Sequence, residues 1–402
     1  MLLRSTLDGA PFTLSLRPHT LTLGVGDTFV VAWDTGGRLY SLYRDDDTFR
    51  RSLGGSVLHK WRDAAGRHWA TLRGAEAAAI VEEAAETAER VLRAHRHPSW
   101  AWMPEPPHAD RARIVEALER AARFRAGPAL ADAADFWQLY EPIGVLPPDQ
   151  YLSVVLQATH GCSFNSCTFC ALHDDGYGVK TPEDFERHAR DVLTWLGESA
   201  VLRRRAVFLG SANALAVPMP RLTALLSVLP GVFVDVPPVH AFVDGFTGAR
   251  KSAGDYRALK ALGLARVYVG LESGHDPLLE FVRKPGRAGD ALATVAAIKG
   301  AGLPVTVIVM TGLGGDRYAE RHVADTVSTL LSMALGPGDL VYFSQLVEEA
   351  GTAYPRLAAA RGIRPLSAAE CRAQRDAIAQ AVRAALPTPL RMATYDVREF
   401  VY

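Results

Sequence analysis

From residue 151 onward the sequence alternates short, β-rich apolar runs with longer stretches of helical periodicity. A helix long enough to cross back over a sheet joins parallel strands, so this alternation predicts a parallel α/β fold. The expected strands are 151–159, 206–209, 239–243, 266–269, 305–311 and 340–346, and the expected helices are 182–196, 219–229, 252–262, 288–301, 319–333 and 367–386. Six strand–helix units predict an open partial TIM barrel, (β/α)6, in which functional groups gather at the carboxyl ends of the strands.

Three of the four cysteines lie together after the first expected strand, as Cys162-x4-Cys167-x2-Cys170. A structural zinc site closes with four protein ligands, and a cubane iron–sulfur cluster is usually held by four cysteines. Three thiolates on one loop therefore favour a four-iron cluster whose fourth iron is open to a non-protein ligand. A three-cysteine zinc site and buried inert thiols are the alternatives. Disulfides fit poorly, because three cysteines cannot pair fully and no secretory signal is visible.

The same stretch resembles the cysteine motif of the radical S-adenosylmethionine (radical SAM) enzymes, Cys-x3-Cys-x-aromatic-Cys. The chain keeps the aromatic residue as Phe169 but has four residues in the first gap, which is similar to a minority spacing of that superfamily. The resemblance implies that Cys162, Cys167 and Cys170 ligate three irons of a 4Fe–4S cluster and that S-adenosyl-L-methionine chelates the fourth. It places Phe169 beside the cofactors and implies the same six-unit partial barrel as the strand pattern.

Small and polar residues follow the second expected strand, at Gly210, Ser211 and Asn213. Glycine lets backbone groups approach a ligand closely. The position corresponds to the superfamily motif that contacts the amino group of S-adenosylmethionine. That motif is often Gly-Gly-Glu, so the resemblance implies backbone contacts here without the acidic one. A tight turn between strand and helix is the alternative interpretation.

Two further strand ends carry candidate contacts to S-adenosylmethionine. The Gly-Leu-Glu-Ser-Gly stretch after the fourth strand resembles a segment shared by oxygen-independent coproporphyrinogen dehydrogenase, the methylthiotransferases and the Elongator catalytic subunit. By that resemblance Glu272 and Ser273 contact S-adenosylmethionine, with helix capping as the alternative for Ser273. Thr311 and Gly312 begin a glycine-rich turn that fits the adenine-side contact of the superfamily. The lack of a second cysteine cluster argues against a methylthiotransferase.

Other polar residues near the strand ends have no assigned role. His160 and His173 flank the cysteines, while His240 and Asp244 follow the third strand. Each could face a substrate, but a structural hydrogen bond is the commoner use of a buried histidine. No catalytic residue is assigned, and Cys371 is expected to be a buried, inert thiol.

The N-terminal part of the chain has a different composition. Strands are expected at 20–23, 28–33 and 38–43, and helices at 74–96 and 110–125. Prolines at 142, 147 and 148 mark a junction. We therefore expect a β-rich and helical N-terminal domain (1–140), the partial barrel (141–347) and a C-terminal helical extension with its tail (348–402).

Two charged stretches of the N-terminal part could be binding sites. The arginines of helix 110–125 could form a nucleic-acid-binding face, but interleaved glutamates favour an ordinary solvated surface. The acidic run 45–47 could bind a cation, and we interpret it as a solvated turn.

Charge and hydropathy limit the class of partner. Lys and Arg total 44 and Asp and Glu total 44, so no net charge draws the chain to nucleic acid or an anionic membrane. The apolar runs are too short to span a bilayer, and a cytoplasmic location is expected. The resemblance implies reductive cleavage of S-adenosylmethionine, an external electron donor such as flavodoxin or ferredoxin, and hydrogen abstraction from a small-molecule substrate. A tRNA or other nucleic-acid substrate, and a non-catalytic iron–sulfur or zinc protein, are the alternatives.

Overall fold

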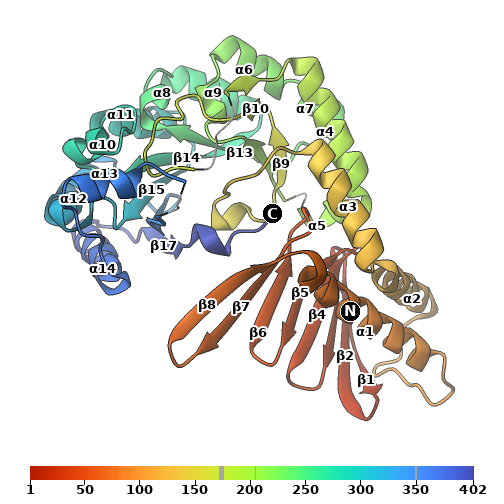
Figure 1. The fold of residues 1–402 in the computed structure, drawn as a ribbon. Helices are drawn as coiled ribbons and strands as arrows, with labels where there is room; N and C mark the ends of the chain where they lie inside the picture. The colour runs from red at the N-terminus through yellow and green to blue at the C-terminus, as the bar shows by residue number, and fades with distance from the viewer. Residues whose placement is uncertain (172–175, 204, 349–350) are drawn as a thin grey trace. The chain divides into compact units, whose positions relative to one another are not determined.

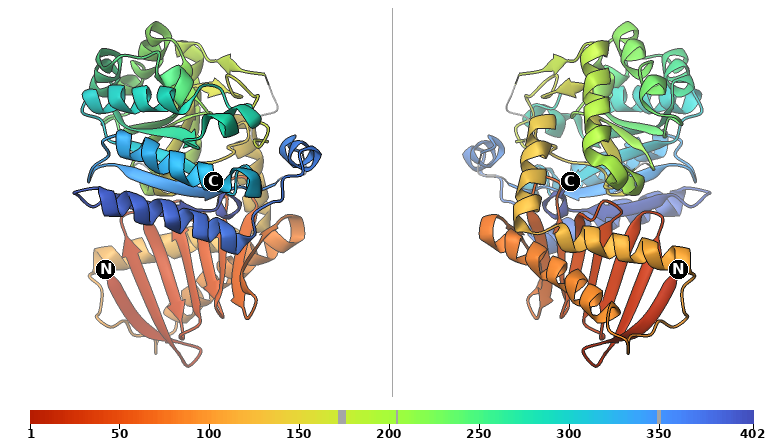
Figure 2. Two further views of the ribbon diagram at one scale, coloured as in Figure 1. Left: turned by 90° about the vertical axis from the view of Figure 1, so that its left-hand side faces the viewer. Right: turned by 90° about the vertical axis from the view of Figure 1, so that its right-hand side faces the viewer.

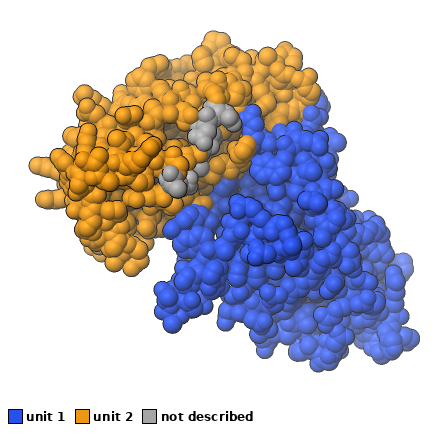
Figure 3. Space-filling model, in the orientation of Figure 1, with its two compact units in different colours: residues 1–141, 190–205, 398–402 blue, residues 142–189, 206–397 orange. Residues whose placement is uncertain are grey.

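The computed structural model describes residues 1–171, 176–203, 205–348 and 351–402. The chain forms two compact units (Figure 3). Unit 1 comprises residues 1–141, 190–205 and 398–402, and unit 2 comprises residues 142–189 and 206–397. The three-part division expected from the sequence stays a prediction.

Unit 1 is built on an eight-stranded antiparallel sheet in which each strand pairs with the next along the chain (Figure 1). Its strands are β1 (Leu2–Leu7), β2 (Ala10–Arg17), β3 (Thr20–Val25), β4 (Phe29–Asp34), β5 (Leu39–Arg44), β6 (Asp47–Arg51), β7 (Val57–Asp63) and β8 (Gly66–Leu72). Asp45 and Asp46, both with positive φ, form the two-residue turn between β5 and β6. Two positive φ values are typical of a type I′ hairpin, so the acidic run is a turn.

Three helices complete most of unit 1: α1 (Gly74–His95), α2 (His108–Arg123) and α3 (Ala126–Leu139). Ile80, Ala84, Ala88 and Val91 of α1 recur at helical spacing and are buried in the same core as the sheet. The predicted arginine-rich surface of 110–125 is covered by ion pairs, because every arginine in it contacts a carboxylate: Arg111–Glu105, Arg113–Asp110, Arg120–Glu116, Arg123–Glu119, and Arg125 with Glu82 and Glu89.

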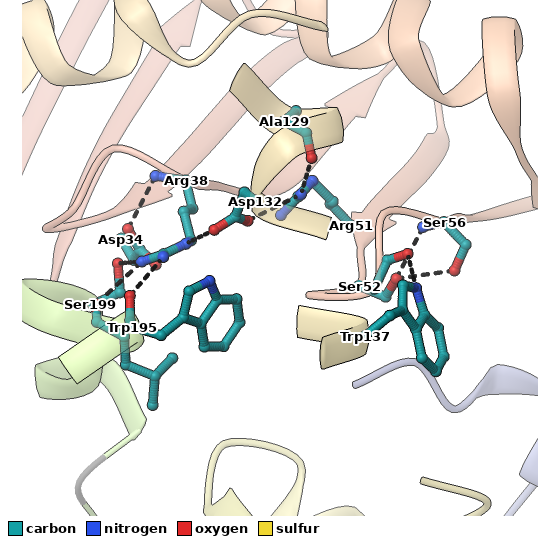
Figure 4. Close-up of polar contacts among 12 residues, drawn as sticks. Asp34, Arg38, Arg51, Ser52, Ser56, Ala129, Asp132, Trp137, Trp195 and Ser199 are labelled. Carbon is teal, nitrogen blue, oxygen red and sulfur yellow. Dashed lines mark hydrogen bonds and ion pairs between the residues drawn. The ribbon is translucent and has the colours of Figure 1, made fainter. Parts of the chain in front are cut away.

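A largely buried guanidinium, Arg38, holds several segments of unit 1 together (Figure 4). Its Nε donates to Asp132 at 2.7 Å, and its terminal nitrogens donate to the backbone carbonyls of Trp195 and Leu196 and to the Ser199 hydroxyl at 2.6–3.0 Å. Carbonyls at the end of a helix have no partner within it, and a cation there also complements the helix dipole. Arg38 is therefore the C-terminal cap of the helix that ends at Leu196.

Unit 2 is a parallel sheet in the order β17-β16-β15-β14-β13-β12-β9. The strands are β9 (Val154–Gln157), β12 (Val207–Gly210), β13 (Val239–Asp244), β14 (Leu264–Glu272), β15 (Val305–Thr311), β16 (Leu340–Gln345) and β17 (Arg391–Tyr395). The α/β partial barrel is confirmed, and the first six strands lie where they were expected. The seventh corrects the expected count: Arg391–Tyr395 comes from the C-terminal part and pairs in parallel with β16.

Helices lie along the outer face of this sheet (Figures 1 and 2). The remaining α-helices and strands of the described chain are α4 (Pro182–Leu196), α5 (Ala200–Arg203), α6 (Met219–Leu226), α7 (Leu229–Val232), α8 (Gly245–Gly248), α9 (Ala253–Ala261), α10 (Asp276–Phe281), α11 (Ala288–Gly300), α12 (Gly315–Ser332), α13 (Tyr354–Ala360), α14 (Ala368–Ala385) and the short strands β10 (Thr159–His160) and β11 (Gly178–Val179). Within the described ranges, no helix combines the length and the apolar character needed to cross a bilayer.

Two buried histidines of unit 2, His188 and His322, and the partly buried His240 have lowered pKa values. Burial lowers the pKa of His188 to about 3 and the pKa values of His240 and His322 to about 4. His188 Nε2 accepts a hydrogen bond from the Gln157 backbone at 3.1 Å, and His322 Nδ1 lies 2.7 Å from the Ser273 hydroxyl. A ring that accepts a backbone N–H must be neutral at that nitrogen.

We expect substitution of Arg38 by Met to lower the free energy of unfolding by about 3 kcal/mol, because it leaves buried helix carbonyls and part of the Asp132 carboxylate without a partner. Urea unfolding monitored by circular dichroism measures the change. Arg123→Met is the matched control, since that arginine is 75% exposed in a helical ion pair, and we expect an effect within about 0.5 kcal/mol. Equal effects of the two substitutions would contradict the proposed role of Arg38.

We also expect stability to fall as the pH drops from 6.5 towards 5. The folded pKa of His322, about 4, lies below its ordinary value of 6.5, so in this range the unfolded state binds more protons than the native state. His322→Asn keeps a polar group near Ser273 but cannot be protonated. Its urea midpoint should depend less on pH than that of the wild type between 6.5 and 5. Parallel pH profiles would show that His322 does not contribute.

Candidate cofactor-binding site

One cavity of unit 2 collects most of the residues predicted from the sequence. It is lined by Cys162, Cys167, Phe169, Cys170, Gly210, Ser211, Asn213 and Glu272. These residues come from the loop after β9 and from the carboxyl ends of β12 and β14. Carboxyl ends of parallel strands meet at one edge of a sheet, which explains how positions more than 100 residues apart come to share a wall.

The cysteine loop is fixed by backbone hydrogen bonds at Thr168. Its N–H donates to the carbonyl of Val282, just after α10, and its own carbonyl accepts from the Tyr354 N–H at the start of α13, both at 2.9 Å. The Phe169 ring packs against a small core that includes Leu278 and Phe281. Because Thr168 and Phe169 sit between Cys167 and Cys170, these contacts position the two thiols.

The thiols lie in a largely apolar and partly closed environment. Burial raises the pKa of the Cys167 thiol to about 11, and the ammonium of Lys284 acts in the opposite direction. A metal would replace the thiol proton on binding. Cys162 and Cys170 lie close enough to Cys167 to affect its pKa as well.

The donor set fits a cluster of several irons. Among the described residues, no three Cys, His, Asp or Glu side chains come close enough together to hold a single metal ion. A cubane takes its thiolates at separate iron corners, and the three thiols that line this cavity could each hold one corner. His173, which the zinc alternative could have used, lies outside the described residues, and the His160 ring packs against the backbone of Gly178.

Glu272 reaches the cavity through an irregularity in β14. The register with β15 shifts between Gly270 and Glu272, and Glu272 has a φ of 59°. Its carboxylate lies 3.5 Å from the Lys284 ammonium. A Cβ at Gly270 would lie 2.7 Å from that carboxylate oxygen. Glycine at this position therefore provides the space that the Glu272–Lys284 pair occupies.

Burial and the opposite charge act against each other at both members of this ion pair. Burial raises the pKa of Glu272, and Lys284 limits the rise. Burial alone would lower the pKa of Lys284, but the charges of Glu272 and Cys167 outweigh it, and the pKa lies above its ordinary value. Lys284 is therefore the cation of the site. Sequence reasoning assigned it no role, although it follows the Gly-Leu-Glu-Ser-Gly stretch closely.

Asn213 connects the cysteine loop to the strand ends. Its side-chain amide donates to the Ser163 hydroxyl, next to Cys162, at 3.0 Å, and also to Asp244. Asp244 in turn accepts from the Thr247 N–H at 2.8 Å, and its own N–H donates to Asn213 Oδ1 at 3.1 Å. Each polar group of this buried network has a partner, so the network holds a single arrangement.

Three of the predicted contacts do not line the cavity. Ser273 is fully buried behind the strand, where its hydroxyl contacts His322 and accepts from the His275 N–H at 3.0 Å. Thr311 is buried at the end of β15. The Gly312 N–H donates to the side chain of Gln374 in α14 at 2.8 Å. Contacts of these three residues with S-adenosylmethionine stay predictions.

Other lining residues had no signal in the sequence. Ile143, Val145 and Leu146 precede β9, and Tyr395 and Val397 belong to or follow β17. The local sequence around these residues does not connect them to the cysteines. The segment before β9 and the segment at β17 reach this cavity only because of the order of strands in the sheet.

Comparison with protein families agrees with this geometry. Residues 156–327 match the Radical SAM superfamily. This part of the chain is a radical SAM domain. A domain of this superfamily implies a 4Fe–4S cluster and S-adenosylmethionine as its cofactors. The assignment to the coproporphyrinogen dehydrogenase, methylthiotransferase and Elongator branch stays a prediction. No curated protein matched the sequence.

Solved structures show only distant likeness. The cobalamin-dependent radical enzyme OxsB is 12% identical over 57% of this chain and 31% of its own, with a TM-score of 0.38. Coproporphyrinogen III oxidase (HemN) from Escherichia coli is 16% identical over 58% and 51%, with a TM-score of 0.40. HydG, a maturase of the [FeFe]-hydrogenase, is 13% identical over 79% and 67%, with a TM-score of 0.41. The matched regions thus span about a third of OxsB and half of HemN.

We expect Gly270→Ala to weaken S-adenosylmethionine binding at least about tenfold, because the new methyl group displaces the Glu272 carboxylate. Calorimetric titration of the anaerobic, cluster-loaded protein measures the affinity. Gly289→Ala is the control: a Cβ there, in α11, meets nothing within 4 Å, and alanine is the better helix former. An unchanged affinity in Gly270→Ala would show that the position of Glu272 is unimportant for binding.

Proposed function

We propose that the protein is a radical SAM enzyme acting on a small molecule, with its cluster held by Cys162, Cys167 and Cys170. One observation carries the proposal: the three thiols share a single cavity with Glu272 and with Gly210. An open iron needs its ligand beside it, and this cavity provides that space. A cluster with a purely structural or electron-transfer role would not need a cavity beside its irons.

The chain supplies the binding and the environment for this chemistry. Bound together, the two cofactors supply reductive cleavage of S-adenosylmethionine and a radical that abstracts hydrogen from a substrate carbon. Gly210 and Ser211 would present backbone groups to S-adenosylmethionine, while Asn213 fixes the loop next to Cys162. Glu272 would accept hydrogen bonds from the ligand's hydroxyl or amino groups. Phe169 holds the loop in place and covers one side of the cavity.

Lys284 has a further role in this proposal. Three thiolates and Glu272 put negative charge into a region with little water, where uncompensated charge is costly. The ammonium of Lys284, 3.5 Å from Glu272, offsets part of it. The Lys284 charge also favours the ionised form of Glu272, in which the carboxylate is an acceptor only.

An external donor such as flavodoxin or ferredoxin would supply the electron, in a cytoplasmic setting. A small-molecule substrate is favoured over nucleic acid, because the arginines around α2 are all paired with carboxylates. Phosphate contacts require cations that are available to the backbone of the nucleic acid.

We expect Cys167→Ala to lose the cluster and to abolish 5′-deoxyadenosine formation, by a factor of at least about 100. The measurements are iron content and 5′-deoxyadenosine release after anaerobic reconstitution and reduction with dithionite. Cys371→Ala is the matched control, because that thiol is buried beside Gly312 rather than in the cavity, and it should retain iron and activity.

Two results would contradict the proposal. Zinc in place of iron after reconstitution would favour the structural alternative. Iron retention and deoxyadenosine release by Cys167→Ala equal to those of Cys371→Ala would show that Cys167 is not a ligand.

A further inference from the structure

The cavity extends from the cysteines to the two edges of the parallel sheet. β9 and β17 are the edge strands, so hydrogen bonding does not close the barrel. The segment before β9 lines the cavity through Ile143, Val145 and Leu146, and the segment at β17 lines it through Tyr395 and Val397. These two segments are a lateral wall built from parts of the chain outside the matched superfamily region, residues 156–327.

Hydrogen bonds below the cavity hold the first of these segments in place. The hydroxyls of Tyr268 on β14 and Tyr342 on β16 both donate to the carboxylate of Asp149, at 2.6 and 3.0 Å. Asp149 lies only three residues after Leu146. Two tyrosines from neighbouring regions of the sheet thus fix the path of residues 143–146, and the wall they form is preorganised for a ligand.

The inward side of the sheet beneath the strand ends is apolar. Val155, Phe208, Phe242 and Ile308 line the cavity there, and the rings of Phe208 and Phe242 pack edge to face with centroids 5.0 Å apart. Together with Val145 and Val397 they give the cavity a hydrocarbon surface on several sides. Such a surface binds a ligand by removing apolar area from water.

Every charged side chain that lines the cavity, within the described residues, is already engaged. Glu272 pairs with Lys284, and Asp244 is bonded to Asn213 and Thr247. Lys284 is the only lysine or arginine among the described lining residues. A phosphate or carboxylate on a substrate would have to compete with Glu272 for it, at the cost of a buried unpaired charge.

We infer that the substrate presents an uncharged, predominantly apolar group, aromatic or branched aliphatic, to the apolar surface that Val145, Phe242 and Val397 contribute to this cavity. The inference rests on the proposed function and specifies its substrate class. The Tyr395 hydroxyl, which contacts Ser344, is a polar group of the lateral wall and suits one neutral hydroxyl or carbonyl on the ligand. Phosphorylated metabolites and nucleotides are excluded from this part of the cavity by the lack of an available cation among its described residues.

Two matched probes test the substrate class. The cluster-loaded enzyme with S-adenosylmethionine, left unreduced, is titrated with p-cresol and with p-tolyl phosphate, and binding is followed by saturation-transfer NMR and calorimetry. We expect p-cresol to bind at least about tenfold more tightly than the phosphate ester. Equal binding, tighter binding of the ester, or no detectable binding of p-cresol overturns the inference.

Substitutions in the wall locate the binding site. Val145→Asp should weaken p-cresol binding at least about tenfold, because it puts a carboxylate against the ring. Val234→Asp introduces the same charge at a fully exposed position and should bind p-cresol as the wild type does. Val145→Thr keeps the shape of valine and should give a smaller loss, so the test holds even where the aspartate variant folds poorly. Equal affinity of Val145→Thr and Val234→Asp would place the probe elsewhere.

The same samples separate this inference from the proposed function. Reduction after the titration gives 5′-deoxyadenosine if the proposed function holds. Normal cleavage of S-adenosylmethionine without preference for p-cresol refutes only the substrate class, whereas failure to cleave S-adenosylmethionine refutes the function itself.

Discussion

The site depends on the two backbone hydrogen bonds that fix Thr168 between Val282 and Tyr354. If the loop that carries the three thiols were flexible, binding a cluster would have to order it, and the lost conformational entropy would weaken binding. The two hydrogen bonds order part of the loop beforehand. Thr168 is the residue between Cys167 and the Phe169–Cys170 pair, so fixing it orients two of the three thiols at once. Helix α13, which comes from the C-terminal part of the chain, is thus a direct support of the cysteine motif. The fold outside the strand–helix core therefore contributes to the cofactor site.

Electrostatics explains why Glu272 and Lys284 occur together. A carboxylate near thiolates in a partly closed cavity would take up a proton unless a cation compensated it, since burial favours the neutral form. Lys284 is that cation, and the pKa of Cys167 responds to it as well. Glu272 is the last residue of β14 and Lys284 follows α10, and Gly270 leaves them the space to approach each other. Gly270, Glu272 and Lys284 therefore depend on one another, and the role of each is apparent only when the three are considered together.

The sequence predicted the strand–helix core well, because buried parallel strands read as apolar runs and their helices carry clear start signals, such as Thr181 before Pro182. It did not predict β17, whose residues are largely exposed and form no apolar run. It also did not show that residues 190–205 and 398–402 belong with the N-terminal unit, since that grouping depends on contacts such as Arg38 with Leu196. For the candidate site, the sequence could nominate residues but not the directions of their side chains. Glu272 and Ser273 are adjacent, and the register shift in β14 sends one into the cavity and the other behind the strand.

The apolar wall also bears on how a carbon radical would survive in this cavity. A thiol S–H gives up its hydrogen readily, so a free cysteine near the substrate would end the reaction early. The lining residues that the structure describes include three cysteines, and all three are proposed cluster ligands without a proton to give. The fourth, Cys371, packs against Gly312 outside the cavity. Val145, Phe242 and Val397 offer less reactive C–H groups and exclude water. The apolar surface that we infer to bind an uncharged ligand therefore also presents no free thiol to the radical among the described lining residues.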